Sequence, residues 1–272
     1  MLKKFLAGAA IATSLLAVSN TASATVLTNW FIDTDGAGAN PAVLVNNYLD
    51  LNGRAYVSNA FDLGSTTNFS FQEVGSFLTI LADGTRLLNP LLSSSFVASG
   101  TGTTGGSLVF TAGGTLKVFS GATDIADFSL QSGSALLNAN STLPNGTVSL
   151  IFKADHMVSG YFFDSGMNDL ASIANSSTGL LLGFATTNVI SLADDALGVP
   201  LASPPNVDPA LITAYNSAFG TALGTVQAND STDLLLSNNG QFRLAVPEPS
   251  MLSLLGLALL GVGFTTRRKS KA

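Results

Sequence analysis

Apolar side chains occupy every second position in several short stretches of the chain, and turn-forming residues separate these stretches. Successive side chains of a β-strand point to opposite faces of the sheet, so a period of two places each apolar set on one face. The pattern predicts a mostly β, antiparallel β-sandwich domain over residues 25–245. Its clearest examples are Phe69 and Phe71; Phe77, Thr79 and Leu81; Leu116 and Val118; Val148, Leu150 and Phe152; and Phe242, Leu244 and Val246.

Glycine and asparagine mark the turns that we expect between these strands. Residues 107–112 and 115–120 flank Gly113-Gly114 and predict a hairpin, because glycine supplies the positive φ that a two-residue primed turn requires. Asn145-Gly146 predicts another turn immediately before a strand. The stretch 99–107 is rich in glycine, serine and threonine, and we expect a loop there.

One helix is predicted shortly after residue 207. Asp208 can cap a helix N-terminus, and Pro209 suits the first helical position because its ring already holds a helical φ. Four apolar residues then follow on one helical face: Leu211, Tyr215, Phe219 and Leu223. We therefore expect one or two short helices beside the strands.

The N-terminal segment has the order of a secretory signal peptide. Lys3 and Lys4 precede an apolar run at 5–18, and the small residues Ala22 and Ala24 follow it. Small residues at the −3 and −1 positions fit signal peptidase, so we expect cleavage after Ala24. The apolar run is short for a bilayer core of about 30 Å, which disfavours a retained anchor.

The C-terminal end contains three elements in a fixed order. Pro247, Glu248 and Pro249 form a stiff extended segment, because each proline ring fixes φ and disfavours a helix at the residue before it. A helix over residues 250–266 would then reach roughly 25 Å and could hold the chain in a membrane. Four basic residues that favour the cytoplasmic side come last: Arg267, Arg268, Lys269 and Lys271. This orientation leaves the Pro-Glu-Pro segment outside, in agreement with the signal peptide.

The tail closely resembles the PEP-CTERM sorting signal, with Pro-Glu-Pro as its motif, 251–264 as its membrane segment and the basic cluster as its membrane stop. The resemblance implies transient residence in the inner membrane of a bacterium and removal of the tail by an exosortase. A plain anchor that is never cut is the alternative. The chain would then comprise a signal peptide at 1–24, an exported β-rich domain at 25–245 and a sorting signal with a transmembrane helix at 246–272.

Four stretches of the body look similar to flocculation-associated PEP-CTERM proteins: 48–53, 160–164, 183–188 and 236–242. That resemblance implies an extracellular protein needed for cells to aggregate within exopolysaccharide. It provides no catalytic residues to transfer to this chain.

The charge of the body excludes some partners. From Thr25 to Val246 there are 16 acidic and 5 basic residues, a net charge near −11, which is unsuited to nucleic acid. The chain has no cysteine, so its fold must be stabilised by its own core even though an oxidising compartment would permit disulfides.

Catalytic chemistry has few candidates in this sequence. His156 is the single histidine, and its neighbour Asp155 would point to the opposite face if the strand continued, which disfavours a Ser-His-Asp triad. Paired carboxylates could hydrolyse glycosides. The candidate pairs are Asp124 with Asp127, and Asp164 with Asp169.

Asp33 and Asp35 are the best candidates for metal ligands. Together with the glycines that follow, they could direct oxygen atoms toward a hard cation such as Ca²⁺. The stretch departs from the twelve-residue Ca²⁺ loop at Ala37, which replaces the third acidic residue, and at Leu44, which replaces the bidentate glutamate. A glycine-rich turn capped by aspartates is the other interpretation. We expect no other cofactor.

We therefore expect an exported matrix or cell-surface protein that is not an enzyme and acts by adhesion. Its expected partners are signal peptidase, an exosortase and the exopolysaccharide matrix. A secreted carbohydrate-active enzyme that uses paired carboxylates is the alternative. Four aromatic residues could stack on sugars or pack in the core: Trp30, Tyr48, Tyr56 and Tyr161.

Overall fold

The computed structural model describes residues 24–37, 42–103, 106–138, 145–176, 179–193, 209–220 and 234–247. The chain divides into two units, one formed by Val26–Val246 and the other by Met1–Thr25 with Pro247–Ala272. Of the second unit, only Ala24, Thr25 and Pro247 are described.

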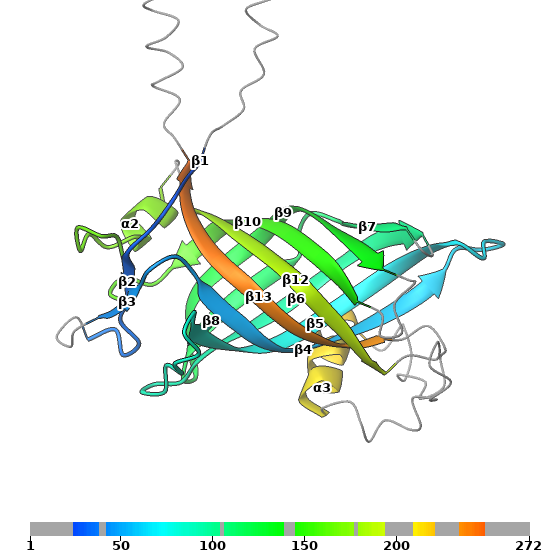
Figure 1. Ribbon diagram of the computed structural model, residues 1–272, viewed down its shortest axis with the longest axis horizontal. Coiled ribbons are helices and arrows are strands. Elements are labelled where there is room, and N and C mark those ends of the chain that lie inside the picture. Colours follow the sequence, from blue (N-terminus) through cyan, green and yellow to red (C-terminus); the bar gives the residue numbers. More distant parts are fainter. Residues whose placement is uncertain are drawn as a thin grey trace, which may run out of the picture. The chain divides into compact units, whose positions relative to one another are not determined.

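Ten strands form one large sheet (Figure 1). They are β1 (Ala24–Val26), β4 (Leu49–Phe61), β5 (Asn68–Leu81), β6 (Leu92–Thr103), β7 (Ser107–Phe110), β8 (Thr115–Ser120), β9 (Thr123–Asn138), β10 (Asn145–Met157), β12 (Leu181–Ala193) and β13 (Leu234–Pro247). Starting from β4, the strand order is β5, β6, β9, β10, β12 and β13, with β7 and β8 both lying between β6 and β9. Because β13 also pairs with β4, the sheet closes on itself.

The predicted mostly β, antiparallel class is confirmed, but the sandwich is wrong. A sandwich has two separate sheets, whereas here β4 and β13 pair continuously from Val57 with Leu234 to Leu49 with Phe242. A period of two requires only that one face of each strand be buried, and both arrangements satisfy that requirement. The predicted strand residues occupy β5, β8, β10 and β13.

The predicted hairpin around Gly113-Gly114 is also wrong. β7 and β8 do not pair with each other; each pairs with β6 on one side and β9 on the other. The connecting backbone bonds to the same two neighbours, since the N–H of Thr111 donates to Ser99 O at 2.8 Å and that of Gly113 to Leu130 O at 2.9 Å. β6 and β9 are long enough to pair with both strands in turn, so the chain continues forward instead of folding back.

Two further turn or loop predictions fall within strands. Most of the stretch 99–107 belongs to β6, which pairs with β5 as far as Thr103 opposite Asn68. Asn145 and Gly146 begin β10 and pair with both β9 and β12. In each case hydrogen bonding to two flanking strands outweighs the local preference of small residues for turns.

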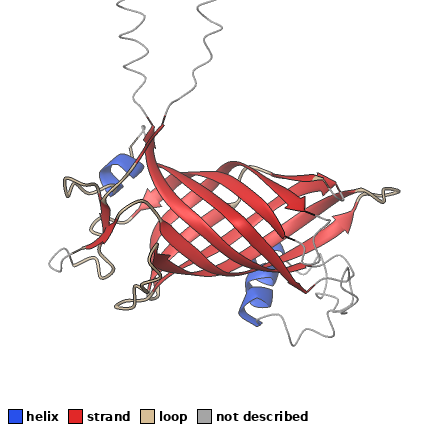
Figure 2. Cartoon of the chain, viewed as in Figure 1, coloured by secondary structure: helices blue, strands red, loops and turns tan. Residues whose placement is uncertain are grey.

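A three-stranded sheet and a short helix lie at one end of the closed sheet (Figure 2). The strands, in spatial order, are β11 (Phe162–Phe163), β2 (Trp30–Ile32) and β3 (Val43–Val45), and the helix is α2 (Ala171–Ala174). Trp30 stacks on Phe162 with ring centroids 6.2 Å apart, and both belong to the main hydrophobic core. Phe128 and Phe242 pack edge to face within the same core, 5.9 Å apart.

The predicted helix is confirmed as α3 (Pro209–Phe219), which packs on the outer face of β4 and β5. Leu211 and Tyr215 are buried there, and the Tyr215 ring meets Tyr56 edge to face at 5.3 Å. The Tyr215 hydroxyl donates to Gln72 Oε1 at 2.9 Å. The predicted capping residue Asp208 and the last apolar position, Leu223, lie outside the described residues.

The two terminal predictions fall largely on residues that are not described. Ala24 begins β1 and Pro247 ends β13, while the rest of the predicted signal peptide and sorting signal lies outside the described ranges. Within those ranges, no helix has both the length and the apolar character needed to cross a membrane.

Inward-facing phenylalanines lie over glycines of the sheet. A Cβ at Gly240 would stand 2.1 Å from the ring of Phe184, and a Cβ at Gly75 would stand 2.5 Å from the ring of Phe77. Side chains do not approach this closely in folded proteins, so these two positions require glycine for the rings to lie inside the sheet.

We predict that Gly240→Ala lowers the free energy of unfolding by about 1–3 kcal/mol, because the added methyl group forces the Phe184 ring out of place. Gly183→Ala is the matched control on β12, since a Cβ there meets no atom within 4 Å. It should change stability by less than about 0.5 kcal/mol. Urea unfolding of the two purified variants measures both effects, and equal destabilisation would contradict the packing described.

Candidate functional site

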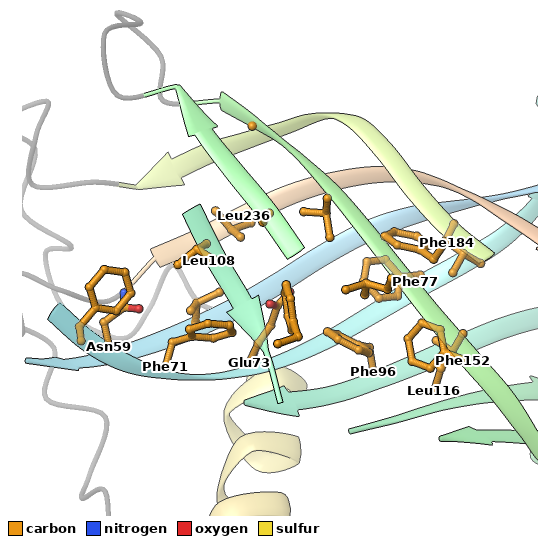
Figure 3. Close-up of a pocket in the computed structure, with 18 residues that line it drawn as sticks. Asn59, Phe71, Glu73, Phe77, Phe96, Leu108, Leu116, Phe152, Phe184 and Leu236 are labelled. Atoms are coloured by element: carbon orange, nitrogen blue, oxygen red, sulfur yellow. The ribbon is translucent and has the colours of Figure 1, made fainter. Parts of the chain in front are cut away.

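The interior of the closed sheet is hollow in the part away from the three-stranded sheet (Figure 3). The cavity has a volume of about 80 Å³, and every strand from β4 round to β13 contributes to its lining. Its wall is almost entirely apolar. Seven phenylalanines form much of it: Phe69, Phe71, Phe77, Phe96, Phe110, Phe152 and Phe184.

Asn59 and Glu73 are the polar side chains in this wall, and Glu73 is the charged one. It lies on β5 with Phe71 and Gly75 as its neighbours on the same face, and its partners across the sheet are Val57 and Ala98. Glu73 is 8% exposed, and it makes no hydrogen bond or ion pair with any other described residue. Figure 3 shows its side chain between those of Phe71 and Phe96 along the cavity.

Burial sets the protonation of this carboxyl group. Removal from water penalises the charged form, and no donor compensates, so the pKa of Glu73 rises to about 7. Near neutral pH the group is therefore divided between its protonated and ionised forms. A largely apolar cavity with a few polar groups is the usual composition of a small-molecule site.

A second hollow lies on the outer face of β4, β5 and β6, with a volume of about 190 Å³. Its polar lining consists of hydroxyl groups and one amide: Ser58, Ser70, Gln72, Ser99 and Thr111. We call this site the outer pocket. Gln72 is held by the Tyr215 hydroxyl of α3, so the helix fixes one of its walls.

The predicted metal ligands Asp33 and Asp35 lie in a tight turn after β2. The N–H of Asp35 donates to Asp33 Oδ1 at 3.2 Å, and that of Ala37 to Asp35 Oδ1 at 2.9 Å. Gly36, with φ of +65°, lies under the ring of Tyr161. The described residues contain no group of three or more histidine, cysteine or acidic side chains that could hold a metal. The hydrogen bonds are those of a capped turn, and Ca²⁺ binding stays a prediction.

The first predicted carboxylate pair forms ion pairs with a lysine. Carboxylate oxygens of Asp124 and Asp127 lie 2.7 and 2.8 Å from Lys117 Nζ. The hydrogen bonds that Lys117 donates to them raise its pKa, and the bond to Asp124 has the larger effect.

The second pair stabilises loops. Asp164 accepts the N–H groups of Gly166 and Asn168 at 2.8 and 2.9 Å, and hydrogen bonding, chiefly from the Asn168 side chain, lowers its pKa. Asp169 accepts the N–H groups of Gly160 and Ala171, both at 2.8 Å. Both carboxylates therefore accept hydrogen bonds from backbone N–H groups.

His156 and Asp155 do not point to opposite faces, as a regular strand would require. The pairing of β10 with β9 shifts register between Ala154 and His156, and both His156 and Asp155 are exposed. Asp155 Oδ1 accepts the hydroxyl of Ser129 at 2.9 Å.

The four candidate sugar-stacking aromatics have different environments. Trp30 and Tyr56 are buried in the core, and Tyr161 covers the turn at Gly36. The Tyr48 ring lies 5.2 Å from the guanidinium carbon of Arg243. Two of the four are therefore core residues.

Sequence reasoning missed Glu73. The alternation of residues 69–81 places it on the same face as Phe71 and Phe77, so a polar residue at an apolar position was the available signal. It is also the only glutamate before the Pro-Glu-Pro segment.

Of the predicted processing residues, Ala24 and Pro247 are described, at the first position of β1 and the last of β13. The others lie outside the described ranges: Ala22, Glu248, Pro249, Arg267, Arg268, Lys269 and Lys271.

Comparison with known families identifies one segment of the chain. The PEP-CTERM protein-sorting motif matches residues 245–269, which confirms the prediction made from the tail. No curated protein and no solved structure shows significant similarity to the chain. The motif indicates an extracellular protein that an exosortase processes and that is sorted to the cell surface.

We predict that Glu73→Gln removes a pH-dependent loss of stability. In the unfolded chain the carboxyl group ionises near 4.5, whereas in the folded protein it keeps its proton to about pH 7. The free energy of unfolding should therefore fall as pH rises through this window, by about 3 kcal/mol in total. The glutamine side chain of the variant does not ionise in this pH window. The free energy of unfolding of Glu73→Gln, relative to that of wild type, should therefore rise by about 3 kcal/mol between pH 4 and pH 8.

Asp83→Asn is the control for this measurement. Hydrogen bonds from Thr85 lower the pKa of Asp83, so its contribution is lost on acidification and has the opposite sign. Urea unfolding across the pH range gives the profiles. Parallel profiles of wild type and Glu73→Gln would contradict a buried, uncompensated carboxyl group.

Proposed function

We propose that the protein acts at the bacterial cell surface or in the extracellular matrix, where it binds exopolysaccharide and promotes cell aggregation. The observation that carries the proposal is the sorting motif at 245–269, which indicates an exosortase-processed extracellular protein. The resemblance of four stretches of the body to flocculation-associated PEP-CTERM proteins supports the finer role. Signal peptidase would remove 1–24, and the inner membrane would hold the precursor until the exosortase acts.

The end of β13 is compatible with this processing. β13 pairs with β12 through Ala245 and with β4 through Phe242, and its last residue, Pro247, is the first of the Pro-Glu-Pro segment. A cut after Pro247 would therefore leave all of these pairings in the released product. The closed sheet would persist after the tail is removed.

The outer pocket is the surface that best suits a polysaccharide. Its serine and threonine hydroxyls and the Gln72 amide can donate to and accept from sugar hydroxyls. The body carries a net charge near −11, which favours a neutral glycan or one whose acidic groups are bridged by cations. Binding by hydroxyl and amide groups alone requires no catalytic residue.

We predict that Ser99→Leu, which fills the outer pocket, weakens binding of the mature protein to the producing cell's own exopolysaccharide by about fivefold or more. Ser132→Leu is the control, because Ser132 is an exposed serine on the outer face of β9 that does not line the pocket. Co-sedimentation with the polysaccharide measures binding. Equal binding by both variants would exclude the outer pocket, and new reducing ends in a parallel assay would favour the carbohydrate-active enzyme.

We also predict that replacing Pro247, Glu248 and Pro249 by alanine traps the precursor in the inner membrane. A plain anchor needs only the apolar run and the basic cluster, whereas an exosortase must recognise the charged residue between two prolines. Immunoblots of membrane fractions should show a species heavier by the retained tail, and the cells should aggregate poorly. Normal processing with normal aggregation would contradict sorting through this motif.

A further inference from the structure

We propose that the interior cavity binds a slender molecule with an apolar chain and a positively charged amino group, with the amino group placed on Glu73. An alkylamine is the simplest member of this class. The site lies inside the closed sheet and is independent of the polysaccharide contacts proposed for its outer face.

Glu73 has no hydrogen-bond or ion-pair partner among the described residues. Because the residue is only 8% exposed, its carboxyl group loses most of its hydration, and the described protein residues give it no hydrogen bond in return. Glu73 itself lines the cavity, so open space lies beside its side chain. The fold would be more stable with an apolar side chain here, which indicates that the carboxylate serves an occupant of the cavity.

The charge of the occupant follows from the lining of the cavity. Among the described residues that line the cavity, Glu73 is the one titratable group, so an ammonium group would meet a single opposite charge and no competing cation from them. A charge-assisted hydrogen bond to a carboxylate is stronger than a neutral one. Phenylalanine faces on the surrounding wall also attract cations. A carboxylate ligand would be repelled.

The shape of the cavity favours a slender occupant. Leu51 and Asn59 both line the cavity, and their separation of eight residues along β4 corresponds to roughly 26 Å at 3.3 Å per residue. A volume of about 80 Å³ over such a length describes a narrow space. Figure 3 shows Asn59 at one end and Phe152 with Leu116 at the other, with Glu73 between them. An unbranched chain suits a space of this form.

Calorimetric titration of the mature protein with octylamine, 1-octanol and octanoate at pH 8 tests the proposal. Wild type should bind octylamine at least about tenfold more tightly than octanol, and octanoate least of all. Glu73→Gln should lose at least about tenfold in octylamine affinity while octanol binding is retained. Asp83→Asn removes one surface charge outside the cavity and should bind like wild type.

Proton release separates this site from surface attraction, because any amine is drawn to a body with a net charge near −11. At pH 7 part of the Glu73 population is protonated, and an ammonium group must displace that proton, so binding should release a fraction of a proton in wild type and none in Glu73→Gln. Titration in two buffers of different ionisation enthalpy measures that release. Octylamine affinities that are equal in wild type and Glu73→Gln, or a folded wild type that binds no octylamine, would overturn the proposal.

Discussion

The pairing of β13 with β4 is the contact on which the rest of the structure depends. These strands are far apart in the sequence, and their backbone hydrogen bonds join the last strand of the sheet to one of the first. Closure gives every strand of the ring two neighbours, which protects edges that would otherwise be free to pair with other chains. It also creates an interior, and both the cavity and the buried position of Glu73 exist because of it.

Glu73 shows how the interior departs from a purely stabilising core. Phe128, Phe242, Trp30 and Phe162 fill one end with aromatic contacts, as stability alone would favour. At the other end the phenylalanines surround space and a carboxyl group whose pKa burial raises to about 7. A cavity and an uncompensated carboxylate both reduce stability, and together they suit a binding site. The outer face, with its hydroxyl-lined pocket, provides a separate surface for the polysaccharide contacts that we propose.

The sequence predicted those features that depend on local patterns. The alternation at Phe69 and Phe71 and the face formed by Leu211 and Tyr215 identified a strand and a helix, because burial of one side leaves a regular period. Closure could not be predicted in this way, since a sandwich and a closed sheet bury the same face. The hairpin predicted at Gly113-Gly114 was wrong because a local turn preference does not determine which strands β7 and β8 pair with. The cavity depends on which rings fill the interior, and only the packing decides that.

Disulfide trapping tests closure most directly, since the chain has no cysteine of its own. Asn52 on β4 and Asn239 on β13 are paired residues, and both side chains are exposed. In a closed sheet, the double variant Asn52→Cys with Asn239→Cys should form an intramolecular disulfide on mild oxidation, because directly opposite Cβ atoms lie about 4.5–5.5 Å apart. Arg54→Cys with Asn239→Cys is out of register and should react much more slowly. Free thiols in both variants, detected by mass spectrometry after alkylation, would contradict the β13–β4 pairing.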